Sequence, residues 1–157
     1  MKNSITIAVD AMGGDGSPLK VINGINHHHK KSKNTFYRIF GNKNEILKCL
    51  SKDLDQNCFE ITHTNEKVEG TDTPLGAAKR GKNTSMWLSI SSVKEKKSDI
   101  VISAGNTGAL LVIAKLNLNM IENIDKPALS GLWPSKKGMS VVLDLGANIE
   151  CSQKNLV

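Results

Sequence analysis

Short apolar runs alternate along this chain with longer segments that carry apolar residues at helical spacing. The runs predict strands at 5–9, 36–40, 58–63, 99–103, 127–133 and 140–145. The segments between them predict helices that follow residue 17, at 44–54, at 74–97 and from the loop at 104–108 to about residue 120. Because the strands are apolar on both faces, we expect an α/β fold with a mostly parallel sheet and helices on both faces.

Proline and glycine mark where two of these helices begin or break. Pro18 suits the first turn of a helix, with Ser17 as its N-cap. Pro74 opens the long helix with Thr73 as its N-cap, and Gly81 predicts a kink or break within it.

The excess of positive charge does not indicate a nucleic-acid partner. The 157 residues carry a net charge of +6, but only 4% of them are aromatic, and Arg38 and Arg80 are the only arginines. A nucleic-acid surface needs clustered basic residues with interleaved aromatics, so we expect no nucleic-acid binding. An arginine kept in so lysine-rich a chain suits bidentate contact with an anion, which lysine makes poorly.

Membrane spans, metal sites and thiol chemistry are not indicated either. The apolar run at 109–114 is far short of the ~20 residues that a span needs, and the start of the chain has no signal-peptide pattern. Cys49, Cys58 and Cys151 form no C-x-x-C pair, and the adjacent histidines at 27–29 point to different sides of a helix. We therefore expect a cytoplasmic protein without a metal or cofactor.

Glycine-rich loops follow two of the predicted strands, at the sheet edge where parallel α/β folds bind ligands. The first, Asp-Ala-Met-Gly-Gly-Asp at 10–15, lets a ligand approach the backbone, with Asp10 and Asp15 to position polar groups. A tight strand-to-helix turn explains it equally well. The second, Ser-Ala-Gly-Asn-Thr-Gly at 103–108, opens a helix whose free amides attract anions, with room for phosphate at Gly105 and Gly108. An ordinary turn of small residues is the alternative.

Two further features are candidates for polar contacts. Asp144 ends a strand and Asn148 follows in the same loop, although an Asx turn at a strand terminus would look the same. Lys79, Arg80 and Lys82 form a basic cluster that predicts either an anion site or a solvated helix face.

These motifs together resemble the bacterial phosphate acyltransferases of phospholipid synthesis. The resemblance rests on Val-Asp-Ala-Met-Gly-Gly-Asp at 9–15, Ser-Ala-Gly-Asn-Thr-Gly-Ala-Leu at 103–110, Lys-Pro-Ala-Leu at 126–129 and Leu-Asp-Leu-Gly-Ala-Asn at 143–148, in the family's order. It implies transfer of a fatty acyl group from acyl carrier protein to inorganic phosphate. It also implies a fold similar to isopropylmalate dehydrogenase and phosphotransacetylase, a homodimer, and a membrane acyltransferase as the consumer of the acyl phosphate, which would bring the protein to the membrane periphery.

Members of that family continue well beyond the length of this chain. We therefore expect residues 1–157 to be the N-terminal portion of a single α/β acyltransferase domain whose C-terminal half is absent, and which is inactive alone. The alternatives are a phosphotransacetylase-like enzyme that uses acyl-coenzyme A and an inactive anion-binding fragment.

Attack of phosphate on a thioester requires no nucleophile from the enzyme, only placement of the dianion and stabilisation of the oxyanion. We therefore expect polar and glycine residues to carry the reaction. The candidate catalytic residues are Asn106, Arg80 and Asp144. The candidate substrate-binding residues are Asp10, Gly13, Gly14, Asp15, Lys79, Lys82, Gly105, Thr107, Gly108 and Asn148.

Overall fold

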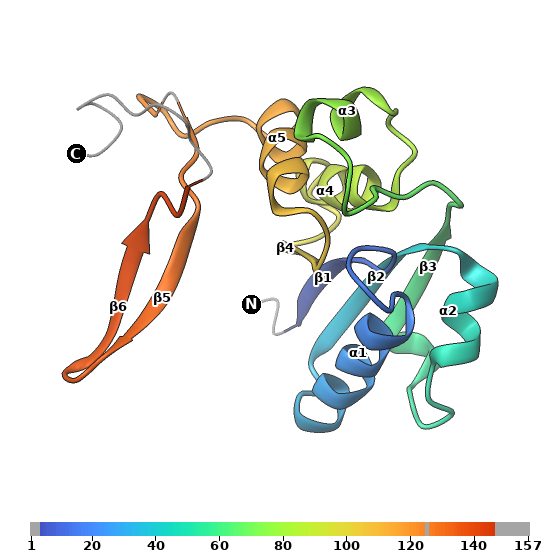
Figure 1. Ribbon diagram of the computed structural model, residues 1–157. Helices are drawn as coiled ribbons and strands as arrows, with labels where there is room; N and C mark the ends of the chain where they lie inside the picture. The colour runs from blue at the N-terminus through green and yellow to red at the C-terminus, as the bar shows by residue number, and fades with distance from the viewer. Residues whose placement is uncertain (1–3, 125, 147–157) are drawn as a thin grey trace. The chain divides into compact units, whose positions relative to one another are not determined.

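A four-stranded parallel sheet forms the centre of the first of two compact units in the computed structural model. The structure describes residues 4–124 and 126–146, and the units are Met1–Leu118 and Asn119–Val157. The strands of the sheet are β1 (Ile5–Asp10), β2 (Thr35–Gly41), β3 (Phe59–His63) and β4 (Ile100–Ser103), in the order β3-β2-β1-β4 (Figure 1). All four were predicted from the sequence, as was their parallel arrangement.

The order of the strands creates a switch point between β1 and β4. The chain builds outward from β1 through β2 to β3 and then returns to the other side of β1 to form β4. Asp10 lies opposite Ser103 in the β1–β4 register, so the two strands end level with each other. Ligands bind in open α/β sheets where the strand order reverses in this way. The loops that follow β1 and β4 are therefore placed to form a site.

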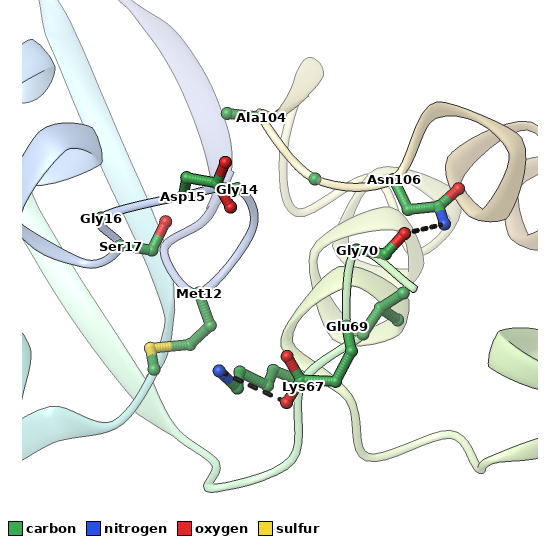
Figure 2. A pocket seen from close by; sticks show the side chains of 12 residues that line it. Met12, Gly14, Asp15, Gly16, Ser17, Lys67, Glu69, Gly70, Ala104 and Asn106 are labelled. Carbon is green, nitrogen blue, oxygen red and sulfur yellow. Dashed lines mark hydrogen bonds and ion pairs between the residues drawn. The ribbon is translucent and has the colours of Figure 1, made fainter. Parts of the chain in front are cut away.

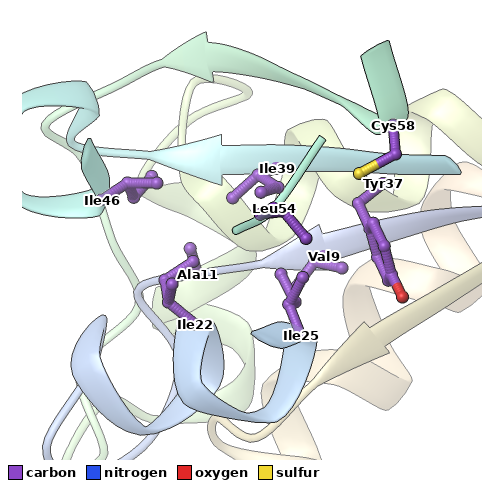
Figure 3. Packing of buried hydrophobic residues seen from close by; sticks show 9 residues of the cluster. All are labelled: Val9, Ala11, Ile22, Ile25, Tyr37, Ile39, Ile46, Leu54 and Cys58. Carbon is purple, nitrogen blue, oxygen red and sulfur yellow. The ribbon is translucent and has the colours of Figure 1, made fainter. Parts of the chain in front are cut away.

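Helices cover both faces of this sheet, as predicted. The first face packs against α1 (Leu19–Lys31) and α2 (Lys43–Cys49), and Figure 3 shows Val9 and Ile39 of the strands meeting Ile22 and Ile46 of these helices. The helix α4 (Ser85–Lys94) packs against β1, β2 and β4. Ala8, which precedes Val9, and Phe40, which follows Ile39, are also buried. Because residues adjacent along a strand point to opposite faces, these two side chains lie on the other face of the sheet. Two separate apolar clusters result, one on each side.

The second apolar cluster joins α4 to two other helices. These are α3 (Pro74–Lys79) and α5 (Thr107–Asn117), and the cluster also takes in a residue of the irregular segment that follows β3. Its buried members are Val68, Ala77, Met86, Ile90, Ala109 and Ile113.

Several helix boundaries differ from the prediction. Ser17 does not cap α1, because its hydroxyl donates to the Gly13 carbonyl and Pro18 itself occupies the N-cap position. The predicted helix at 74–97 is divided into two helices, α3 and α4, and the break predicted at Gly81 is confirmed, with Gly81 at φ +133°, a conformation that residues other than glycine rarely adopt. Thr73 caps α3 as predicted, accepting from Gly76 N at 3.1 Å. The helix predicted at 44–54 ends at Cys49 and is followed later by a short 3₁₀ turn, Gln56–Cys58.

The second unit contains an antiparallel hairpin. Its strands, β5 (Ser130–Ser135) and β6 (Gly138–Leu143), correspond to the last two strands predicted from the sequence, but they pair with each other rather than joining a parallel ladder. A two-residue connection allows only antiparallel pairing, since a parallel crossover needs a dozen residues or more. Across both units, no helix in the described ranges has the length and apolar character needed to cross a lipid bilayer.

Candidate functional site

Two glycine-rich loops make a close backbone contact at the switch point. Gly14, in the loop after β1, has φ +84°, and a Cβ atom on it would lie 2.4 Å from the carbonyl oxygen of Ala104 in the loop after β4. A Cβ on Gly13 would lie 2.7 Å from Asp10 Oδ2 and 2.9 Å from the backbone nitrogen of Gly105. Consecutive glycines are therefore required for these loops to meet.

The Asp10 carboxylate connects the two loops through hydrogen bonds. Its side chain is only 1% exposed, and Oδ2 accepts a hydrogen bond from Ser103 Oγ at 2.7 Å. Oδ1 accepts from the backbone of Met12 at 3.3 Å, and Ser103 Oγ in turn accepts from Gly105 N at 3.1 Å. Asp10 therefore acts on the loops that surround the site and not on the space between them.

An open pocket of about 390 Å³ lies between these loops and a third segment (Figure 2). The loop after β1 contributes Met12 and residues 14–17, and the loop after β4 contributes residues 104–106. The third wall is formed by residues 67–70, which lie in the irregular connection between β3 and α3. Of the predicted site residues, Gly14, Asp15, Gly105 and Asn106 line this pocket together.

The third wall was missed at the level of the sequence. Residues 67–70, Lys-Val-Glu-Gly, have no helical or strand periodicity, and no strand directly precedes them. The available signal was the length of the irregular connection from 64 to 73, because long loops in compact folds are often functional. Within it Val68 is buried in the second apolar cluster, whereas Lys67, Glu69 and Gly70 are exposed.

The side chain of Asn106 is committed to protein groups. As the N-cap of α5, its Oδ1 accepts from Ala109 N at 3.0 Å. Its Nδ2 donates to the carbonyl oxygens of Gly70 at 3.1 Å and Asp72 at 2.9 Å. These contacts connect the helix that follows β4 to the third wall of the pocket.

The first turn of α5 lies beyond the pocket lining. Thr107 begins the helix, and Gly108 packs closely against α3, since a Cβ atom on it would be 2.8 Å from Pro74 Cγ. The absence of a side chain at Gly108 therefore serves helix packing.

The predicted basic cluster does not converge on one point. Arg80 pairs with the carboxylate of Asp72 and also donates from Nη1 to the carbonyl of Lys67 at 3.2 Å. Lys79 is exposed at the end of α3, and Lys82 lines a separate hollow beside Trp87. The cationic side chain at the pocket is that of Lys67, whose Nζ lies 3.3 Å from Glu69 Oε1.

The last two predicted site residues belong to the second unit. Asp144 follows β6 with φ 57°, and Asn148 lies outside the described residues. In the described part of the chain, no three histidine, cysteine, aspartate or glutamate residues gather in a way that could hold a metal ion.

Comparison with known proteins gives a consistent result along the whole chain. A family model described as "Fatty acid synthesis protein" matches residues 5–157. A protein of Pelagibacter ubique named phosphate acyltransferase is 72% identical over all of this chain, which corresponds to 47% of that relative. Proteins of the same name from Rhodospirillum rubrum and Paramagnetospirillum magneticum are 43% and 37% identical, again over the whole chain and 45% of each relative. The chain thus spans about half the length of the curated relatives it matches.

Proposed function

This chain belongs to the fatty acid synthesis protein family, and we propose that it forms the N-terminal portion of a phosphate acyltransferase that transfers a fatty acyl group from acyl carrier protein to inorganic phosphate. The observation that supports this most directly is the polar pocket at the switch point between β1 and β4. It is built from the two glycine loops, which carry two of the four segments on which the resemblance to phosphate acyltransferases rests.

The reaction suits a pocket of this kind. A phosphate oxygen attacks the thioester carbonyl carbon and forms the new carbon–oxygen bond, the carbon–sulfur bond breaks, and the carrier thiolate leaves and takes up a proton. The products are acyl phosphate and free carrier protein. Because phosphate is the nucleophile, the protein needs only to hold it beside the thioester and stabilise the developing oxyanion. Backbone amides of glycine-rich loops can supply such contacts.

The predicted site residues take different parts in this proposal. Gly14, Asp15 and Gly105, which line the pocket, are the candidates for substrate contact, while Gly13 and Asp10 support them. The predictions for Thr107, Gly108, Lys79, Lys82, Asp144 and Asn148 remain to be tested by substitution.

The resemblance to phosphate acyltransferases also suggests the surroundings of the enzyme. We propose that a membrane acyltransferase consumes the acyl phosphate and that the enzyme works in the cytoplasm at the membrane periphery. We also propose that the whole protein is a homodimer that uses no cofactor.

A chimera with the Pelagibacter ubique relative provides the test. Residues 1–157 of this chain would replace the matched portion of that protein, to which they are 72% identical. We expect phosphate-dependent release of the carrier thiol from acyl-carrier protein and incorporation of radiolabelled phosphate into a lipid-extractable product. The unmodified relative is the positive control. Thiol release that does not depend on phosphate, or none from a folded chimera whose positive control is active, would contradict the proposal.

Two further arms separate the alternatives. If acyl-coenzyme A is used in preference to acyl-carrier protein, the phosphotransacetylase-like alternative is correct. We expect the 157-residue chain alone to form no acyl phosphate. Activity from it would show that these residues do not need the remaining half of a domain.

A further inference from the structure

We propose that Arg80 and Asn106 are positioning residues, which together hold the segment 67–72 in place and with it the third wall of the pocket, residues 67–70. The effect on catalysis rests on the proposed function, whereas the contacts that these two residues make do not depend on it. This assigns both residues a different role from the direct substrate contact that their sequence context predicts.

Arg80 holds the segment at both of its ends. Its Nη2 atom pairs with Asp72 Oδ1, and its Nη1 atom donates to the carbonyl oxygen of Lys67 at 3.2 Å. The planar guanidinium can serve two acceptors at once, which the ammonium of lysine cannot do with the same fixed geometry. The Asp72 side chain is 15% exposed and that of Arg80 is 40% exposed, so the pair is partly shielded from water.

Asn106 holds the same segment from the side of α5. Its Nδ2 group donates to the carbonyl oxygens of Gly70 and Asp72, while Oδ1 caps the helix. Asp72 is thus held through its carboxylate by Arg80 and through its carbonyl by Asn106. Its other carboxylate oxygen accepts from Glu69 N at 2.7 Å, which closes a turn within the segment.

Apolar packing alone would not keep this wall in place. Val68 is its one buried side chain, at 5% exposed. Gly70 has open space where a Cβ would point, and Lys67 and Glu69 are exposed. The hydrogen bonds from Arg80 and Asn106 therefore decide where the side chains of Lys67 and Glu69 are presented to the pocket.

A double-mutant cycle in the chimera distinguishes positioning from direct contact. If Arg80 acts through Asp72, Arg80→Ala and Asp72→Ala each lower kcat/KM by a similar factor, roughly tenfold, and the double variant is no worse than the poorer single one. If Arg80 instead contacts phosphate, Asp72→Ala frees the guanidinium and leaves the phosphate KM unchanged or lower, while Arg80→Ala raises it. The second pattern would overturn the proposal.

Conservative variants add a readout that simple destabilisation would not produce. Arg80→Lys keeps the charge but not the planar guanidinium with its two donors, so we expect it to be as impaired as Arg80→Ala. Recovery of the phosphate KM by lysine would argue for a charge role instead.

Asn106→Ser keeps a hydroxyl that can cap α5 and loses both amide donors. We expect kcat/KM to fall with little change in melting temperature. Lys48→Gln, an exposed charge change on α2, is the matched control and should retain full activity.

Hydrogen exchange tests the contacts in the 157-residue chain, without any need for activity. The Glu69 amide donates to Asp72, so its exchange should accelerate roughly tenfold in Arg80→Ala and in Asn106→Ser, while the amides of β2 remain unchanged. Unchanged exchange at Glu69 would overturn the proposal even if the chimera is an active acyltransferase. If exchange at Glu69 accelerates but the chimera transfers no acyl group, the positioning role of Arg80 and Asn106 is supported and the proposed function is contradicted.

Discussion

The carboxylate of Asp10 accepts a hydrogen bond from Ser103 Oγ at 2.7 Å, although 93 residues separate the two in the chain. Asp10 ends β1 and Ser103 ends β4, and the two lie opposite each other in the register of the sheet. This contact joins the two strands at the point where the strand order reverses. It therefore fixes the relative position of the two glycine loops that line the pocket.

Removing this contact should measurably weaken the fold. In Ser103→Ala the buried carboxylate loses its hydroxyl donor and Gly105 N loses its acceptor, so we expect the free energy of unfolding to fall by about 1–3 kcal/mol. Urea unfolding of the 157-residue chain measures this. Ser32→Ala is the control, because its hydroxyl has only a neutral partner, Thr35, at 3.4 Å. An equal loss of unfolding free energy in the two variants would show that the contact with Asp10 stabilises the fold no more than an ordinary hydrogen bond between two hydroxyl groups.

Opposite effects are expected from adding one methyl group at two glycines. Gly14→Ala places a Cβ atom against the Ala104 carbonyl at φ +84°, and the backbone conformation alone costs about 1–2 kcal/mol. Gly24→Ala lies within α1, with nothing within 4 Å of the new atom, and should stabilise the fold by about 0.5–1 kcal/mol. Thermal and urea unfolding compare the two variants directly. A stabilising Gly14→Ala would mean that the two loops do not approach as the structure has them.

The helix that carries Arg80 at its end depends on its cap. Thr73→Ala removes the hydroxyl that accepts from Gly76 N, so we expect a loss of about 1 kcal/mol. Thr73→Ser retains the hydroxyl and is expected to retain most of the stability. Urea unfolding distinguishes the two, and an equal loss in both would assign the effect to the missing methyl group rather than to the cap.

Stability should decline in alkaline solution. Burial, the largest cause, raises the pKa of the Cys58 thiol above its ordinary value of 9.0 and that of the Tyr37 hydroxyl above 10.0. Above pH 9 the unfolded chain therefore loses these protons before the folded chain does. Because the folded state then binds more protons, the free energy of unfolding falls as the pH rises.

Urea unfolding between pH 8 and pH 11 measures this decline, and Cys58→Ala identifies the part due to the thiol. We expect the variant to be less stable at pH 8, because a buried side chain is shortened, but to lose less stability on going to high pH. A slope identical to that of the unmodified chain would show that Cys58 does not contribute.

Much of the local structure was accessible from the sequence because it depends on neighbouring residues. The apolar runs at 5–9 and 36–40 predicted β1 and β2 closely, and Thr73 before Pro74 correctly marked the start of α3. Ser17 looked equally suited to cap a helix but donates to Gly13 instead. A cap predicted from residue type fails when the loop offers the same hydroxyl another partner.

The candidate site was only partly predictable for the same reason. The glycine loops at 10–15 and 103–108 stood out by composition, and both lie at the carboxyl edge of the parallel sheet as expected. The wall at 67–70 carries no periodic pattern, and the pairing of Arg80 with Asp72 depends on a loop whose shape no local rule specifies. A basic cluster in the sequence shows that positive charge is present, but it does not show which groups the charged side chains contact.

The sequence by itself determined the alternation of strands and helices, and with it the parallel sheet and the positions of the glycine loops, because periodicity and turn preference act over a few residues. Only the tertiary structure decided that β4 lies beside β1, so that Asp10 meets Ser103, and that Arg80 contacts the carboxylate of Asp72 and the carbonyl of Lys67. These arrangements depend on contacts between segments that are far apart in the sequence. Such contacts form only when the helices pack against the two faces of the sheet.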